Sequence, residues 1–211
     1  PSDLNEKTGI KNSYFGISYV PRTFDFGITK LQDSIKEQTI TTTNKNGKTF
    51  NVGVKDKRRE DTQTWSLNDN GYQGVELKVP LVGDVKRNMN DGDTPFEADD
   101  LTEQVKKNNQ NEVNKSENEH LMVTSEDQTI MYTNGGQFVN GVYDLQLGDV
   151  GLQIPDPSRV PDQTFKGNVT WTLTNTPMKQ HYLTKEIRNL FKDGNCTTLK
   201  TDIRCQDVEA A

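Results

Sequence analysis

Apart from carboxylates, side chains that commonly carry out catalysis are scarce in this sequence. The 211 residues include two histidines and two cysteines, and both cysteines, Cys196 and Cys205, lie near the C-terminus. We find no Gly-x-Ser-x-Gly elbow, no His-Glu-x-x-His motif and no phosphate-binding loop. Only a carboxylate pair of the glycosidase type stays open, because Asp and Glu number 31. We therefore expect a protein that is not an enzyme and carries no cofactor.

Acidic residues gather in one polar stretch of the chain. Their spacing matches no EF-hand loop, and acidic clusters are usually solvated. We therefore expect no metal site, with calcium as the alternative reading. The residues concerned are Asp91, Asp93, Glu97, Asp99 and Asp100.

One compact basic group stands out in a chain whose formal net charge is −6. It consists of Lys55, Lys57, Arg58 and Arg59. Arginine forks match carboxylates and phosphates, so these cations are candidate charge contacts. The alternative is a solvated strand end, balanced by the acidic residues beside it. An excess of acidic residues argues against nucleic acid as a partner.

Two Trp-x-Leu tripeptides are the other candidate site residues. Side chains two apart on a strand point to the same face, so Trp65 lies beside Leu67, and Trp171 beside Leu173. Buried core is the default for such rows. The alternative is an exposed platform on which the indole rings stack against sugar rings.

The elements around these residues read as an all-β domain. Short apolar alternations are separated by Asn-Gly and Gly-Gly turn signals, as in residues 39–54 and 130–136. The turn signal at Asn46-Gly47 predicts a hairpin between the flanking strands. Regular spacing of such strands favours an antiparallel β-sandwich or a barrel-like arrangement.

Two segments depart from this pattern. Residues 83–120 are polar and predict a long surface insertion, mobile or partly helical. After Pro177, Leu183, Ile187 and Phe191 fall at helical spacing and predict a short amphipathic helix. We expect a domain over 1–177 and a C-terminal extension over 178–211, its last residues a polar tail.

Whole-chain composition narrows the class further. Hydrophobic residues make up 30% of the chain, and mean hydropathy is −0.87. No apolar run approaches the roughly 18 residues of a membrane span. We therefore expect no transmembrane segment.

Four ordered motifs between about Gly9 and Pro177 resemble one known family. They are Val20-Pro21-Arg22-Thr23-Phe24-Asp25-Phe26-Gly27, Val52-Gly53-Val54-Lys55-Asp56-Lys57-Arg58, Trp65-Ser66-Leu67 and Gly167-Asn168-Val169-Thr170-Trp171-Thr172-Leu173-Thr174-Asn175-Thr176-Pro177. Together they resemble the WxL domain of Gram-positive surface proteins. The chain departs from that pattern in its long polar stretch and in continuing beyond the second Trp motif.

The resemblance implies a function as well as a fold. It implies a secreted protein of the cell surface that attaches non-covalently to the cell wall, with peptidoglycan as the expected ligand. It also implies assembly with other surface proteins. The alternative is a protein–protein module that docks another surface protein or a host-matrix protein through a sheet face or edge.

Overall fold

The computed structural model describes most of the chain. The described residues are 4–7, 14–43, 48–60, 63–70, 76–89, 105–107, 112–123, 126–160, 163–177 and 198–210. Within these ranges, the regular structure is β-strand except for one 3-10 turn, η2 (Pro157–Arg159). The prediction of an all-β, largely antiparallel domain is confirmed.

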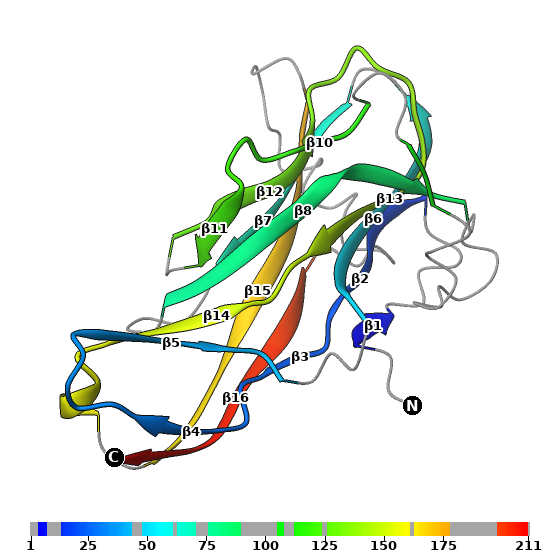
Figure 1. The fold of residues 1–211 in the computed structure, drawn as a ribbon. Helices are drawn as coiled ribbons and strands as arrows, with labels where there is room; N and C mark the ends of the chain where they lie inside the picture. The colour runs from blue at the N-terminus through cyan, green and yellow to red at the C-terminus, as the bar shows by residue number, and fades with distance from the viewer. Residues whose placement is uncertain are drawn as a thin grey trace, which may run out of the picture.

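A nine-stranded antiparallel sheet forms one layer (Figure 1). Its path runs, in order, through β1 (Asn5–Lys7), β2 (Phe15–Pro21), β6 (Phe50–Glu60), β13 (Val139–Leu147), β8 (Glu76–Asn88), β14 (Gly151–Pro155) and β5 (Glu37–Thr41). Two further strands also pair with β8, namely β9 (Val105–Lys107) and β11 (His120–Val123).

A seven-stranded sheet forms the second layer and contains both Trp-x-Leu strands. Its order is β10 (Asn114–Lys115), β12 (Gln128–Thr133), β7 (Gln63–Asn70), β15 (Gln163–Pro177), β16 (Thr198–Ala210) and β3 (Thr23–Asp25), with β4 (Ile28–Leu31) also paired to β16. Strand β16 runs antiparallel to β15 but parallel to β3 and β4.

The hydrophobic core includes inward-facing residues from both sheets. Strand β15 shows the alternation clearly, with Val169, Trp171 and Leu173 buried and Thr174 exposed. Phe24 of β3 meets Phe50 of β6 edge to face, with ring centroids 5.1 Å apart. Because one contiguous cluster links both sheets, the two layers share a single core.

The predicted hairpin across Asn46-Gly47 is wrong. Strand β5 pairs with β14 and strand β6 pairs with β2 and β13, so the two strands are not neighbours. A turn signal reports a change of chain direction but not which strand becomes the partner. By contrast, Gly135 and Gly136 both have φ of 74° and connect β12 in one sheet to β13 in the other.

The polar stretch 83–120 is not simply an insertion loop. Strand β8 continues to Asn88, and residues 105–107 and 114–115 also form strands. Of the two alternatives, mobile or partly helical, the second has no support in the described part of this stretch, which contains no helix. Residues 90–104, which contain the acidic cluster, lie outside the described residues.

The extension after Pro177 also departs from expectation. The predicted helix around Leu183–Phe191 lies outside the described residues. Residues 198–210, expected as a polar tail, instead form β16 between β15 and the β3–β4 pair. The backbone hydrogen bonds of a ladder stabilise a polar strand that has little apolar sequence signal. None of the described residues belongs to a helix with the length and hydrophobicity of a membrane span.

Candidate functional site

Trp65 of β7 is a core residue with one buried polar contact. Its side chain is 2% exposed, and its indole Nε1 donates to Oδ2 of Asp56 on β6 at 3.0 Å. Because β7 and β6 belong to different sheets, this hydrogen bond connects the two layers. Burial of the ring is thus compatible with a satisfied indole N–H.

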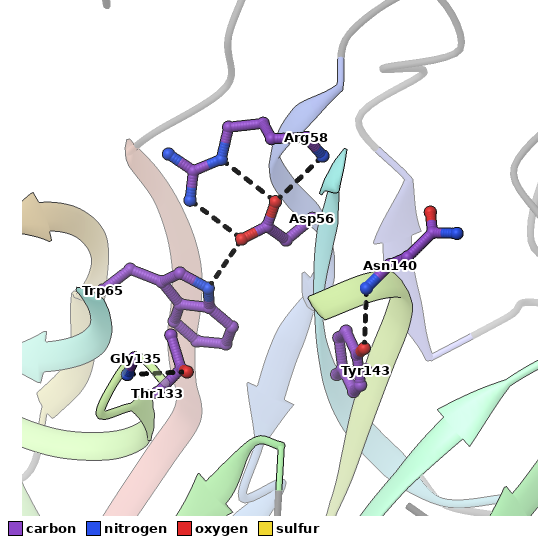
Figure 2. A network of polar contacts seen from close by, with 7 residues as sticks. All are labelled: Asp56, Arg58, Trp65, Thr133, Gly135, Asn140 and Tyr143. Carbon is purple, nitrogen blue, oxygen red and sulfur yellow. Dashed lines mark hydrogen bonds and ion pairs between the residues drawn. The ribbon is translucent and has the colours of Figure 1, made fainter. Parts of the chain in front are cut away.

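Asp56 also anchors the arginine beside it (Figure 2). The Arg58 guanidinium donates Nε to Oδ1 at 3.0 Å and Nη2 to Oδ2 at 2.8 Å, and the Arg58 backbone N–H donates to Oδ1. The guanidinium carbon of Arg58 lies 3.9 Å from the ring centroid of Phe15, a cation–π contact. The Arg58 guanidinium is therefore held by two contacts within the domain, one with Asp56 and one with Phe15.

The second motif tryptophan has an equivalent arrangement. Trp171 is fully buried, and its Nε1 donates to Oγ1 of Thr201 on β16 at 2.7 Å. The Thr201 hydroxyl donates in turn to the carbonyl oxygen of Pro21 at 2.5 Å. This chain of two hydrogen bonds connects β15, β16 and the end of β2.

These positions exclude a sugar-stacking platform built from the motif residues. Trp65, Leu67, Trp171 and Leu173 are all buried, the most exposed of them at 4%. A ring with no accessible face cannot stack against a pyranose. Of the two readings that the sequence left open, the structure supports the core.

The middle residue of each tripeptide points away from the core. Ser66 and Thr172 are half-buried, as is Asn68, whose Oδ1 accepts a hydrogen bond from Thr129 Oγ1 at 2.9 Å. Register places Asn68 between Thr129 and Thr172, and Ser66 opposite Thr174. The outer face of the two motif strands is therefore rich in hydroxyl and amide groups.

The basic group does not form one exposed patch. Lys55 is buried at 5% exposure, Lys57 is half-buried, and Arg58 is engaged with Asp56 and Phe15. Arg59 is the exposed member. A shared surface contact by all four cations is therefore excluded, because Lys55 is buried and Arg58 is bound to Asp56.

A buried polar network occupies the nine-stranded sheet on the face opposite Val52 and Val54. Tyr19 Oη donates to Asp144 Oδ2 at 2.6 Å, and Asn51 Nδ2 donates to both carboxylate oxygens of Asp144, at 3.0 and 3.2 Å. Burial raises the pKa of Asp144 to about 6, although hydrogen bonds from Tyr19 and Asn51 lower it in part. These hydrogen bonds fix the register of β2, β6 and β13.

Gly53 makes room for this network. A Cβ atom at Gly53 would lie 2.3 Å from Cζ of the Tyr19 ring, which is closer than any real contact. The glycine within the motif around Val52 is therefore needed for close approach.

Asp69 is a buried carboxylate that accepts no side-chain hydrogen bond within the described structure. It follows Trp65 and Leu67 on the inward face of β7, is 1% exposed, and lies opposite Trp171 in the ladder. Burial raises its pKa to about 7, with a smaller contribution from the nearby charge of Asp127. The sequence signal for Asp69 was a carboxylate at the next alternate position after the apolar residues Trp65 and Leu67.

Exposed aromatic residues occur elsewhere, and sequence reasoning missed them. Tyr14 is 70% exposed just before β2, and Phe138 is 56% exposed just before β13. Both immediately precede a buried strand residue, so periodicity alone gave no separate signal for them. In the described part of the chain, we find no group of three or more His, Cys, Asp or Glu placed to hold a metal ion.

A comparison with protein families identifies the family to which this chain belongs. Residues 1–177 match the WxL domain family, described as a surface cell wall-binding domain, and the chain belongs to this family. The domain is therefore a cell-surface, wall-attaching module. Strand β16 lies beyond the matched residues yet inside the sheet.

Comparisons with curated proteins and with solved structures give no further information on function. A comparison with curated proteins finds no match. Among solved structures, a family 123 glycoside hydrolase from Clostridium perfringens is similar, at 8% identity and a TM-score of 0.31. That similarity covers 90% of this chain but only 23% of the hydrolase, and it carries no argument about function.

Proposed function

We propose that this domain attaches its protein non-covalently to the cell wall by binding peptidoglycan, and that it does so without catalysis. The observation that carries the proposal is the family match, which extends from residue 1 to 177 and includes both Trp-x-Leu strands. The tryptophans contribute indirectly, by holding the two sheets together.

Electrostatics support short-range recognition. The net charge of −6 gives no long-range attraction to a wall that bears carboxylates and phosphates. At physiological salt the Debye length is only about 8 Å. Binding then depends on local hydrogen bonds, ring stacking and individual cations.

Sedimentation with purified sacculi stripped of secondary polymers tests this proposal. We expect the folded chain to pellet with the sacculi and to release no muropeptides during incubation. A destabilised variant, Trp171→Ala, serves as the folding control, because it removes a core ring without altering the surface directly.

Two results would contradict the proposal. One is a folded chain that stays in the supernatant, especially if it captures a neighbouring surface protein instead. The other is release of soluble glycan fragments, which would identify a hydrolase.

A further inference from the structure

Four adjacent strands of the nine-stranded sheet have exposed side chains at the same end. Tyr14 precedes β2, Arg59 lies near the end of β6, Phe138 precedes β13, and Met89 follows β8. The strand order β2-β6-β13-β8 makes them neighbours across the sheet, and Figure 1 shows the labelled strands β2, β6 and β13 side by side. We call these four residues the aromatic edge.

Backbone pairing fixes this alignment. Phe15 pairs with Asp56, and Asp56 pairs with Gly141, so these three residues lie at one level across three strands. The Lys57 N–H donates to the carbonyl oxygen of Tyr14 at 2.7 Å. With strands about 4.8 Å apart, the edge from β2 to β8 is roughly 15 Å wide.

The aromatic edge concentrates exposed apolar groups. Tyr14, Phe138 and Met89 are three of the five large hydrophobic side chains found exposed among the described residues, and the other two are Ile28 and Val82. Exposed apolar side chains that gather next to polar groups mark interaction sites more often than isolated ones do. Two of the three are aromatic, with rings that offer flat faces.

Arg59 has a backbone that costs energy to maintain. Its φ is 61°, in the left-handed region that non-glycine residues rarely adopt. It belongs to a bulge in which residues 57–59 lie opposite Asn140 alone. Asp56 immediately precedes the bulge and accepts two hydrogen bonds from the Arg58 guanidinium. These contacts hold the backbone of the bulge in place. Strained residues on rigid supports cluster at functional sites.

We propose that the aromatic edge is the contact site for the glycan strand of peptidoglycan. The rings of Tyr14 and Phe138 stack against the apolar faces of the sugars, and the Arg59 guanidinium pairs with a stem-peptide carboxylate. This inference rests on the proposed function and assigns it a site. Stacking needs the flat apolar faces of a sugar ring, which favours the glycan over a phosphate polymer.

Two variants and a matched control test the site. Tyr14→Ala with Phe138→Ala removes both rings, and Arg59→Gly removes the cation while keeping a residue that accepts positive φ. Ile28→Ala is the control, because Ile28 is 60% exposed and lies on β4 of the other sheet. Circular dichroism and melting temperature show that each variant is folded.

Binding is measured with polymer-free sacculi and with soluble disaccharide fragments that carry or lack the stem peptide. We expect the double variant to bind sacculi at least tenfold more weakly, and I28A to bind like the parent chain. Arg59→Gly should weaken binding of the peptide-bearing fragment alone and should flatten its salt dependence.

These measurements distinguish an error in the proposed site from an error in the proposed function. If the parent chain binds sacculi and the folded double variant binds equally well, the site is wrong and the proposed function stands. If the parent chain itself does not bind, the proposed function fails. Equal loss of both fragments in Arg59→Gly would contradict the carboxylate contact.

Discussion

Asp69 makes the stability of the domain depend on pH. Its pKa rises from 3.8 to about 7 through burial, so the folded chain retains a proton that the unfolded chain has already lost. The stability that this proton provides is complete below about pH 4 and is lost as the pH rises to about 7. Asp144, whose pKa rises to about 6 through burial, acts in the same direction.

We therefore expect Asp69→Asn to stabilise the domain at pH 8 but not at pH 4. The amide avoids the cost of a buried ionised carboxylate, on the order of 2–4 kcal/mol at high pH. Urea unfolding at both pH values measures the effect, with the exposed Asp33→Asn as control. An equal effect of D69N at both pH values would show that Asp69 does not titrate in this range.

Thr201 allows a second residue-scale prediction. Thr201→Val keeps the shape but leaves the Trp171 indole N–H and the Pro21 carbonyl without their partner. We expect a loss of about 1–3 kcal/mol in unfolding free energy. Thr174→Val, on the exposed face of β15, should change it by less than about 0.5 kcal/mol. Similar losses in both variants would contradict a special role for the buried hydroxyl.

At the scale of elements, β6 depends on its glycine. Gly53→Ala would drive a Cβ atom into the Tyr19 ring and disturb the hydrogen bond from Tyr19 to Asp144. We expect a loss of about 2 kcal/mol or more from such overpacking. Gly83→Ala is the comparison, because that site has open space and a φ of 67°, so its cost is backbone strain of about 1 kcal/mol.

Thermal unfolding of the two glycine variants decides this prediction. A Gly53→Ala chain that melts at or above the temperature of Gly83→Ala would mean that the Tyr19 ring relaxes without cost. Loss of the Tyr19 contact would also be visible in near-ultraviolet circular dichroism.

Local sequence patterns predicted the strands correctly but did not predict which strands pair with each other. The alternation of Val169, Trp171 and Leu173 correctly assigned the inward face of β15, because side-chain period is a local property. The pairing of β5 with β14 instead of β6 depends on residues more than a hundred positions apart. No turn signal contains that information.

The candidate site was predicted less well than the fold. Trp65 and Trp171 were recognised as important, but sequence alone did not separate core from surface, because both roles need the same side chains two apart. The aromatic edge was missed, since Tyr14 and Phe138 become neighbours only through the order β2-β6-β13. Of the basic group, only Arg59 proved exposed.

At the scale of the whole molecule, β16 completes the seven-stranded sheet. A chain that ends at Pro177 would leave β15, β3 and β4 without their shared neighbour and Trp171 without Thr201. We expect such a chain to melt at least about 10 °C lower than the full chain, since several kcal/mol are lost. Scanning calorimetry of the two chains measures the difference, and equal melting temperatures would show that β16 is dispensable.

The position of β16 also sets the order in which the domain can assemble. Strands β3 and β4 are synthesised well before β15, yet the strand that lies between them and β15 is β16, which follows all other described strands in the sequence. Contacts that join distant parts of a chain form slowly. During export, the gap beside Trp171 therefore stays open until residues 198–210 have crossed the membrane and β16 can pair.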